Sequence, residues 1–98
     1  MLTKKQKRFL RAQSHHIQPI FQVGKAGVGE QMIRQINEAL EARELIKITV
    51  LQNCMMDQED VVEALLEGTA SYIVQVIGHT IVLYKRAQKQ PKIMLPES

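Results

Sequence analysis

The sequence has no tryptophan and only one cysteine among 98 residues, and both shortages argue against whole classes of protein. Cys54 has no partner for an internal disulfide, which argues against a small secreted domain held together by disulfides. A reducing compartment is the simplest setting for such a chain, and we expect a cytoplasmic protein. Two phenylalanines and two tyrosines are too few for a surface dominated by stacking on unpaired bases.

Long hydrophobic runs are missing as well. The longest ones, such as Ile81 to Tyr84, fall far short of the roughly 20 residues that cross a bilayer. The chain begins with charged residues and lacks the apolar core of a signal peptide, so we expect no membrane segment. Apolar residues still make up 45% of the chain, which is enough for a single packed domain over residues 1–98.

Charge is plentiful but unevenly distributed about a net value of +3. Residues 1–29 contain six basic residues and no acid, residues 30–67 contain nine acids and three basic residues, and residues 68–98 contain four basic residues and one acid. If the two ends of the chain meet in space, the protein has one basic face, which attracts polyanions, and one acidic face. The charge pattern alone favours equally a protein whose charges simply cover solvated helices.

Apolar spacing and breaks at glycine and proline predict seven elements in the order α-β-α-β-α-β-β. The helices cover about residues 4–16 after a Thr3 cap, about residues 30–44, and a segment that follows an Asp57 cap; the strands cover residues 20–23, 45–51, 72–77 and 80–84, the last two joined at Gly78. Strands that alternate with helices imply crossovers, whereas the closing hairpin is antiparallel. We therefore expect a single α+β (α/β-like) domain with helices packed on a mixed four-stranded sheet.

Three further expectations concern surface and ends. The basic, proline-containing tail, about residues 87–98, is predicted to be mobile or only loosely docked. Gly68 is expected to weaken the end of the third helix. The acids of the second and third helices are expected to form a solvated face.

The segment Gly24-Lys25-Ala26-Gly27 joins the first predicted strand to the second predicted helix. At such a junction backbone N–H groups and a helix N-terminus converge on an anion, and glycine lets a phosphate approach without a Cβ in its way. Lys25 adds a mobile positive charge at the tip. The spacing is equally compatible with a tight turn that needs glycine for its backbone angles and binds nothing.

Nucleotide-binding motifs do not fit this loop. A P-loop has a serine or threonine directly after its lysine, where this chain has Ala26. The dinucleotide fingerprint orders its glycines as Gly-x-Gly-x-x-Gly, whereas Gly24, Gly27 and Gly29 give Gly-x-x-Gly-x-Gly. We therefore expect no small-molecule substrate.

No arrangement of residues indicates catalysis or a metal. His15 and His16 are neighbours on a predicted helix, so their side chains diverge, and neither Cys54 nor His79 stands at metal-ligand spacing from them. A catalytic thiol or hydroxyl needs a poised base, which the sequence does not indicate. We expect no metal, no cofactor and no enzymatic activity.

Three blocks of sequence resemble a known family. In order along the chain they are QVGKAG at residues 22–27, EALEARELIK at 38–47, and VQVIG at 74–78 leading into IVLY at 81–84. Their order and separations resemble the CRM domain, specifically its free-standing bacterial form, the YhbY-like RNA-binding proteins. The resemblance extends from Leu10 to about Leu95. A serine, threonine or asparagine often stands in that family where this chain has Gly29.

The resemblance implies a fold similar to the C-terminal domain of translation initiation factor three, and it implies RNA as the partner. Bacterial members of the family associate with the precursor of the large ribosomal subunit. The resemblance therefore points to precursor large-subunit ribosomal RNA within a pre-ribosomal particle. The family's Gly-x-x-Gly loop matches Gly24 to Gly27, and loops of this kind in KH domains clamp RNA backbone.

The candidate RNA-binding residues fall into a loop group and a basic group. In the loop, Lys25 and the backbone of Gly24, Ala26 and Gly27 would hold phosphate. The basic group, supported by charge alone, consists of Lys4, Lys5, Lys7, Arg8 and Arg11 in the first helix and Lys85 and Arg86 after the last strand. The alternative is a protein-interaction module on the ribosome or another RNA–protein complex, which would use the acidic helices or the segment from Ile93 to Leu95.

Overall fold

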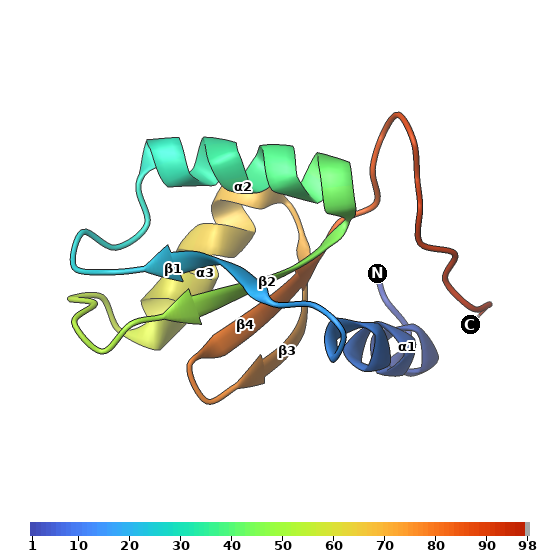
Figure 1. The fold of residues 1–98 in the computed structure, drawn as a ribbon, viewed down its shortest axis with the longest axis horizontal. Helices are drawn as coiled ribbons and strands as arrows, with labels where there is room; N and C mark the ends of the chain where they lie inside the picture. Colours follow the sequence, from blue (N-terminus) through green and yellow to red (C-terminus); the bar gives the residue numbers. More distant parts are fainter. Residues whose placement is uncertain (98) are drawn as a thin grey trace.

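The computed structural model describes residues 1–97 and contains the seven elements in the predicted order (Figure 1). They are α1 (Lys4–Ser14), β1 (Pro19–Val23), α2 (Glu30–Arg43), β2 (Leu45–Val50), α3 (Gln58–Thr69), β3 (Tyr72–Ile77) and β4 (Thr80–Tyr84). No helix within residues 1–97 is both long enough and apolar enough to cross a bilayer.

The four strands form one mixed sheet in the order β1-β2-β4-β3. β1 runs parallel to β2, β2 pairs antiparallel with β4, and β4 pairs antiparallel with β3. The predicted α+β class with a mixed four-stranded sheet is therefore confirmed. Because β1 and β2 are parallel, they end at the same edge of the sheet. The segments that follow them, residues 24–29 and 51–57, are consequently neighbours.

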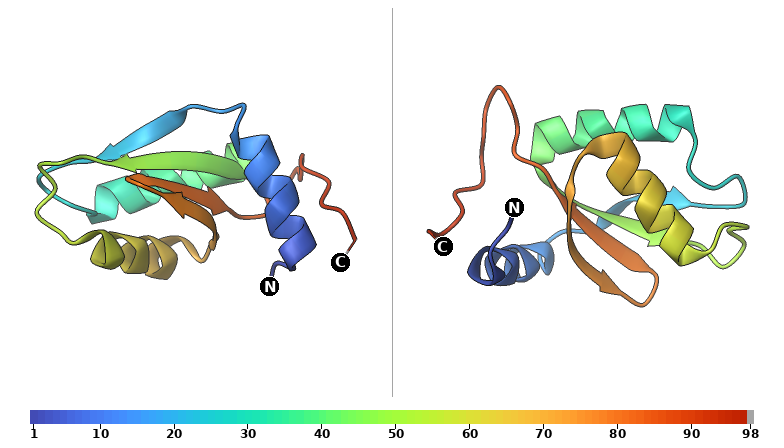
Figure 2. Two further views of the ribbon diagram at one scale, coloured as in Figure 1. Left: turned by 90° about the horizontal axis from the view of Figure 1, so that it is seen from below. Right: turned by 180° about the vertical axis from the view of Figure 1, so that it is seen from behind.

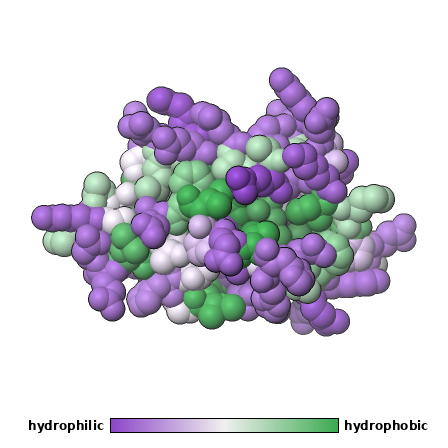
Figure 3. Space-filling model, in the orientation of Figure 1, coloured by the Kyte–Doolittle hydropathy of each residue, from purple (hydrophilic) through white to green (hydrophobic). Residues whose placement is uncertain are grey.

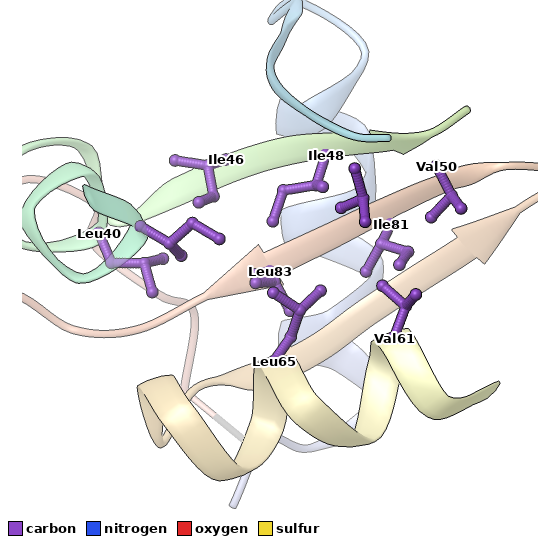
Figure 4. Packing of buried hydrophobic residues seen from close by; sticks show 10 residues of the cluster. Leu40, Ile46, Ile48, Val50, Val61, Leu65, Ile81 and Leu83 are labelled. Atoms are coloured by element: carbon purple, nitrogen blue, oxygen red, sulfur yellow. The ribbon is translucent and has the colours of Figure 1, made fainter. Parts of the chain in front are cut away.

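One face of the sheet carries the main core, which α2 and α3 cover. Ile46, Ile48 and Val50 project from β2 toward Leu40 of α2 and Leu65 of α3 (Figure 4). Complete burial of each such side chain stabilises the fold by about 1.5–3 kcal/mol. This cluster holds α2 and α3 against the sheet.

The opposite face carries α1, which lies across one end of the sheet (Figure 2, left). Leu2 and Leu10 pack there against Leu45 and Tyr84. Because alternate residues of a strand point to opposite faces, Leu45 belongs to this second cluster although Ile46 belongs to the main core. Leu45 begins β2 and Tyr84 ends β4, so α1 lies far from the edge where β1 and β2 end.

Thr3 caps α1, as predicted. Gln6, which pairs with Thr3 in this cap, also connects the two ends of the chain. The Thr3 hydroxyl accepts a hydrogen bond from the Gln6 N–H (3.1 Å), and the Gln6 side-chain oxygen accepts one from the Thr3 N–H (3.1 Å). The Gln6 amide nitrogen also donates to the Pro96 carbonyl (3.1 Å). The two ends of the chain therefore meet in space. A single basic face formed by both ends requires this contact.

α3 differs from its prediction at both ends. Asp57 occupies the N-cap position, but its side chain makes no capping hydrogen bond. Gly68, expected to weaken the end of the helix, lies where α3 approaches α2, and a Cβ there would come within 2.6 Å of the Ile33 side chain. Its role is to permit this close approach. The helix ends instead at Ala70, which has φ +50 and donates its N–H to the Leu66 carbonyl (3.1 Å).

The prediction of a mobile or loosely docked tail is wrong, because a buried carboxylate holds the tail in place. Glu44 lies between α2 and β2 with φ +67 and none of its surface exposed. Its carboxylate accepts hydrogen bonds from the N–H groups of Ala87 (2.8 Å), Lys92 (2.6 Å) and Ile93 (2.7 Å), and its backbone carbonyl accepts one from Lys85 (2.9 Å). Hydrogen bonds to an ionised acceptor are roughly twice as strong as neutral ones. We call this arrangement the Glu44 anchor.

Glu41 holds the tail at a second point but remains exposed, so it stays part of the predicted solvated face, whereas the buried Glu44 does not. The Glu41 carboxylate accepts hydrogen bonds from the N–H groups of Gln88 (2.9 Å) and Lys89 (3.1 Å). These two bonds lower the pKa of Glu41 below its ordinary value. The Lys92 ammonium donates in turn to the Ala42 carbonyl (2.8 Å) at the end of the same helix.

The protonation of Glu44 is linked to the docking of the tail. Burial raises the pKa of this carboxyl group, but the three tail N–H groups and the charge of Arg86 lower it, and the net pKa lies below the ordinary value of 4.5. A carboxyl group whose pKa is lower in the folded state stabilises the fold above its unfolded pKa. This contribution is lost as the pH falls through the folded-state pKa.

Replacing Glu44→Gln should lower the free energy of unfolding by about 1–3 kcal/mol, because a neutral amide with a single acceptor oxygen leaves buried tail N–H groups unpaired. Urea denaturation measures this change. Amide hydrogen exchange at Ala87, Lys92 and Ile93 should accelerate in the same variant. Glu38→Gln, which changes an exposed acid of the preceding helix α2, is the matched control and should change stability by less than about 0.5 kcal/mol.

Lowering the pH tests the same anchor without a substitution. In the unmodified protein the amides of Ala87, Lys92 and Ile93 should lose protection from exchange as the pH falls below 4.5, and Glu44→Gln should keep only the part of this step that protonation of Glu41 causes. Tail amides that keep full protection in Glu44→Gln would contradict the anchor.

Candidate functional site

The glycine loop follows β1 at the edge of the sheet where β1 and β2 end (Figure 1). Gly24 and Gly27 close a turn in which the Gly27 N–H donates to the Gly24 carbonyl (3.0 Å). Gly27 has φ +71, a conformation that L side chains rarely adopt. The backbone therefore requires glycine here, and the turn leaves Lys25 and Ala26 exposed at its tip.

A methionine from the neighbouring segment supports this turn from below. The Met56 sulfur accepts a hydrogen bond from the Val28 N–H (3.5 Å), and a Cβ on Gly27 would lie 2.5 Å from that sulfur. On the other side of the turn, a Cβ on Gly24 would lie 3.8 Å from Asn53. The role of Met56 under the loop has no local signal, because Met56 and Val28 are 28 residues apart.

The exposed tip of the turn carries two backbone N–H donors, those of Lys25 and Ala26. Within residues 1–97, the backbone N–H groups of Lys25 and Ala26 have no hydrogen-bond partner. The Gly27 N–H is different, because the turn itself uses it, and this removes it from the predicted set of phosphate donors. Two adjacent free N–H groups and a lysine on one exposed tip are suited to bind a single phosphate oxygen or a small anion.

The N-terminus of α2 contributes less to this site than the sequence suggested. Gly29 is its N-cap and provides no side-chain hydrogen bond, so the first N–H groups of the helix remain uncapped by a side chain. Glu30 lies in the first turn, where its charge is stabilised by the helix dipole and opposes an incoming anion. The candidate anion site is thus confined to the tip of the glycine turn itself.

The basic residues of α1 form an exposed stripe. Lys4, Arg8, Arg11 and His15 are spaced four, three and four residues apart, so they lie on one side of the helix, and all four are exposed. Lys5 is exposed as well, but Lys7 is half-buried. The first turn of α1 contains no acidic residue that would neutralise the stripe.

The structure brings some of the candidate residues together and keeps others apart. Lys85 and Arg86 follow β4, at the end of the sheet that α1 covers, so they join the basic end of the molecule. Lys25 lies at the other end of the sheet (Figure 1). The candidate site therefore has two parts, the glycine turn and the α1 end, separated along the sheet within a molecule that measures 39 × 27 × 22 Å.

Metal-ligand geometry is not found in the described part of the chain. Within residues 1–97 no three His, Cys, Asp or Glu side chains gather as a metal site requires. His79 lies 3.2 Å from the Gln58 side chain at the closing hairpin, and Cys54 is half-buried against the main core. The candidate site therefore consists of backbone N–H groups and basic side chains carried by a mixed sheet.

The chain belongs to the CRS1/YhbY (CRM) domain family, whose model matches residues 2–85. The resemblance carried by the three sequence blocks is thereby confirmed. The "Probable RNA-binding protein YqeI" of Bacillus subtilis is 64% identical over 96 residues, which cover 98% of this chain and 100% of that protein. An "RNA-binding protein" of Haemophilus influenzae is 37% identical over 95 residues, which cover 97% of this chain and 95% of that protein.

The fold has a solved counterpart. The solution structure of SAV1595 from Staphylococcus aureus superimposes with a TM-score of 0.78 at 53% sequence identity. The match covers 98% of this chain and 100% of that one.

Replacing Gly27→Ala should lower the free energy of unfolding by about 1–3 kcal/mol, because alanine is strained at φ +71 and its Cβ would displace the Met56 sulfur. Gly29→Ser is the matched control. Position 29 has φ −116 and open space around a Cβ, and a serine there can cap α2 and raise stability by about 0.5–1 kcal/mol. Thermal denaturation measures both changes, and equal stability of the two variants would contradict this description of the loop.

Proposed function

We propose that this protein binds RNA and that the Gly24–Gly27 turn holds a phosphate of the RNA backbone. Membership of a family whose relatives are named RNA-binding proteins supports the first part. The observation that carries the second is the exposed tip, where the backbone N–H groups of Lys25 and Ala26 are free and the side chain of Lys25 is exposed. A phosphate oxygen accepts hydrogen bonds from such N–H groups, and the lysine replaces a condensed counterion.

The α1 stripe and Lys85–Arg86 bind the same RNA at the other end of the molecule. β1 and β2 separate the two parts by about 17–20 Å, taken as five to six strand residues at 3.3 Å each. That distance corresponds to roughly five to six nucleotides, on the scale of 3.4 Å per nucleotide of a B-DNA strand. An RNA that lies along the β1 edge can therefore contact both parts.

The function we infer is that of a ribosome-assembly factor whose target is precursor large-subunit ribosomal RNA in a pre-ribosomal particle. The resemblance of three sequence blocks to the YhbY-like proteins supports this target. The protein acts in this proposal by binding, and no catalytic step or cofactor enters it.

A protein-interaction module is less well supported by the tail. Ile93 and Leu95 pack against the second apolar cluster, and Met94 between them is 88% exposed. The segment therefore offers a partner little apolar surface beyond one methionine.

Lys25→Ala should weaken binding to a fragment of large-subunit ribosomal RNA by about three- to tenfold and reduce the slope of log K against log salt concentration by about 1. Fluorescence anisotropy with a labelled RNA fragment, measured over a range of salt concentrations, gives both quantities. Lys25→Arg keeps the charge and should retain most of the affinity. Lys89→Ala removes an exposed lysine outside the proposed interface and should change the affinity less than twofold. Binding that responds neither to Lys25→Ala nor to salt would contradict the phosphate site.

Crosslinking in cells tests the proposed target separately. Sequencing of the RNA crosslinked to the protein should give reads concentrated on large-subunit ribosomal RNA and its precursor, with fewer after Lys25→Ala. Reads distributed evenly over messenger RNA would contradict the ribosomal target and leave RNA binding itself intact.

A further inference from the structure

A pocket of about 460 Å³ lies at the end of β1 opposite to the glycine turn. The end of α1, the start of β1, the last residue of α2, the start of β2 and the tail all contribute to it. β1 lies on the face shown in Figure 3, where apolar side chains gather in the middle and polar side chains surround them. The lining of the pocket is mixed in the same way. We call its apolar residues, which include Ile20, Leu45 and Ile93, the floor, and its polar residues the rim.

An irregularity in the sheet supplies part of this floor. Pro19 pairs with Lys47 and Phe21 with Ile48, so Ile20 has no partner on β2. Such bulges are rare between parallel strands, and they re-aim a side chain relative to the sheet. Ile20 remains 38% exposed and lines the pocket.

The Glu44 anchor positions another residue of the pocket floor, and it also keeps a negative charge out of the pocket. The anchor fixes the N–H groups of the tail, and this places Ile93 in the pocket wall. Glu44 stands between two pocket residues, Arg43 and Leu45, but its carboxylate is buried and turned toward the tail. No carboxylate therefore lines the pocket, and Arg43 gives it a positive charge.

We propose that this pocket holds one unpaired base of the bound RNA, an inference that rests on the proposed function. Its rim consists of Gln13, His16, Gln18 and Arg43. The guanidinium and the imidazole are planar groups that stack on bases, and the two carboxamides offer both donors and acceptors to a base edge. A charged phosphate gains no stabilisation from contact with the apolar floor, whereas the faces of a base are apolar and pack against it.

The position of the pocket fits a continuous path for the RNA. Arg11 and His15, at the end of the α1 stripe, precede the pocket residue His16 in sequence, and the glycine turn lies about 17 Å away along β1. The backbone thus follows the basic stripe and the β1 edge, and one base leaves the strand to enter the pocket. The glycine turn supplies affinity for any sequence, and the pocket supplies preference for a base.

Selection from a pool of randomised RNA tests this division. The unmodified protein should enrich RNA with a preferred base at one position, and Arg43→Ala should reduce that preference about tenfold. Arg34→Ala is the matched control, because it removes an exposed arginine from the same helix outside the pocket. It should lower affinity slightly and keep the preference. Gln18→Ala should change which base is preferred and leave the salt dependence of binding unchanged.

The outcomes separate the pocket from the proposed function. If the unmodified protein retains no RNA from the pool at low salt, the proposed function fails, and the pocket with it. If RNA is retained but Arg43→Ala and Arg34→Ala behave alike, or no base is preferred, RNA binding stands and the pocket proposal is overturned.

A titration of the ¹⁵N-labelled protein locates the base directly. Adenosine, guanosine, cytidine and uridine 5′-monophosphates should be added separately, with ribose 5-phosphate as the control that lacks a base. At least one nucleotide should shift the amide signals of Ile17, Ile20 and Leu45, and ribose 5-phosphate should not. Equal shifts with ribose 5-phosphate would show that the rim binds phosphate alone and would overturn the proposal.

Discussion

The Glu44 anchor is the interaction on which the rest of this end of the molecule depends. One buried carboxylate, placed by a residue with φ +67, receives three N–H groups of the tail, and the carbonyl of the same residue receives Lys85 as β4 ends. Burying a carboxylate without partners costs free energy, so the N–H groups of the tail stabilise the buried charge while the charge holds the tail in place. The anchor also turns a negative charge away from the pocket and brings Ile93 into its wall.

The parallel pairing of β1 and β2 has a comparable effect at the opposite end. It places the glycine turn beside the segment that carries Met56, and that contact holds the turn in the conformation that exposes the N–H groups of Lys25 and Ala26. A single antiparallel hairpin would not bring these two segments to one edge with a helix leaving each of them. The proposed phosphate site and the proposed base pocket thus lie at the two ends of one edge strand.

Local pattern explains why most of the fold was predictable. Thr3 with Gln6, the three- and four-residue spacing of Ile33, Ile36 and Leu40, and Gly78 in the closing turn are signals within a few residues of one another. The glycine turn was predictable in the same way, as a backbone that needs glycine. Its ligand was not, because a turn and an anion site have the same local sequence, and only the resemblance to the CRM domain pointed to RNA.

The sequence by itself determined the seven elements, the mixed sheet, the family and the position of the glycine turn. The tertiary structure decided that Glu41 and Glu44 anchor the tail, that Gly68 is a helix contact, and that the basic residues divide between two ends of the sheet. The physical reason is the separation along the chain. Glu44 and Ile93 are 49 residues apart, and no local periodicity records which distant N–H group a carboxylate will meet.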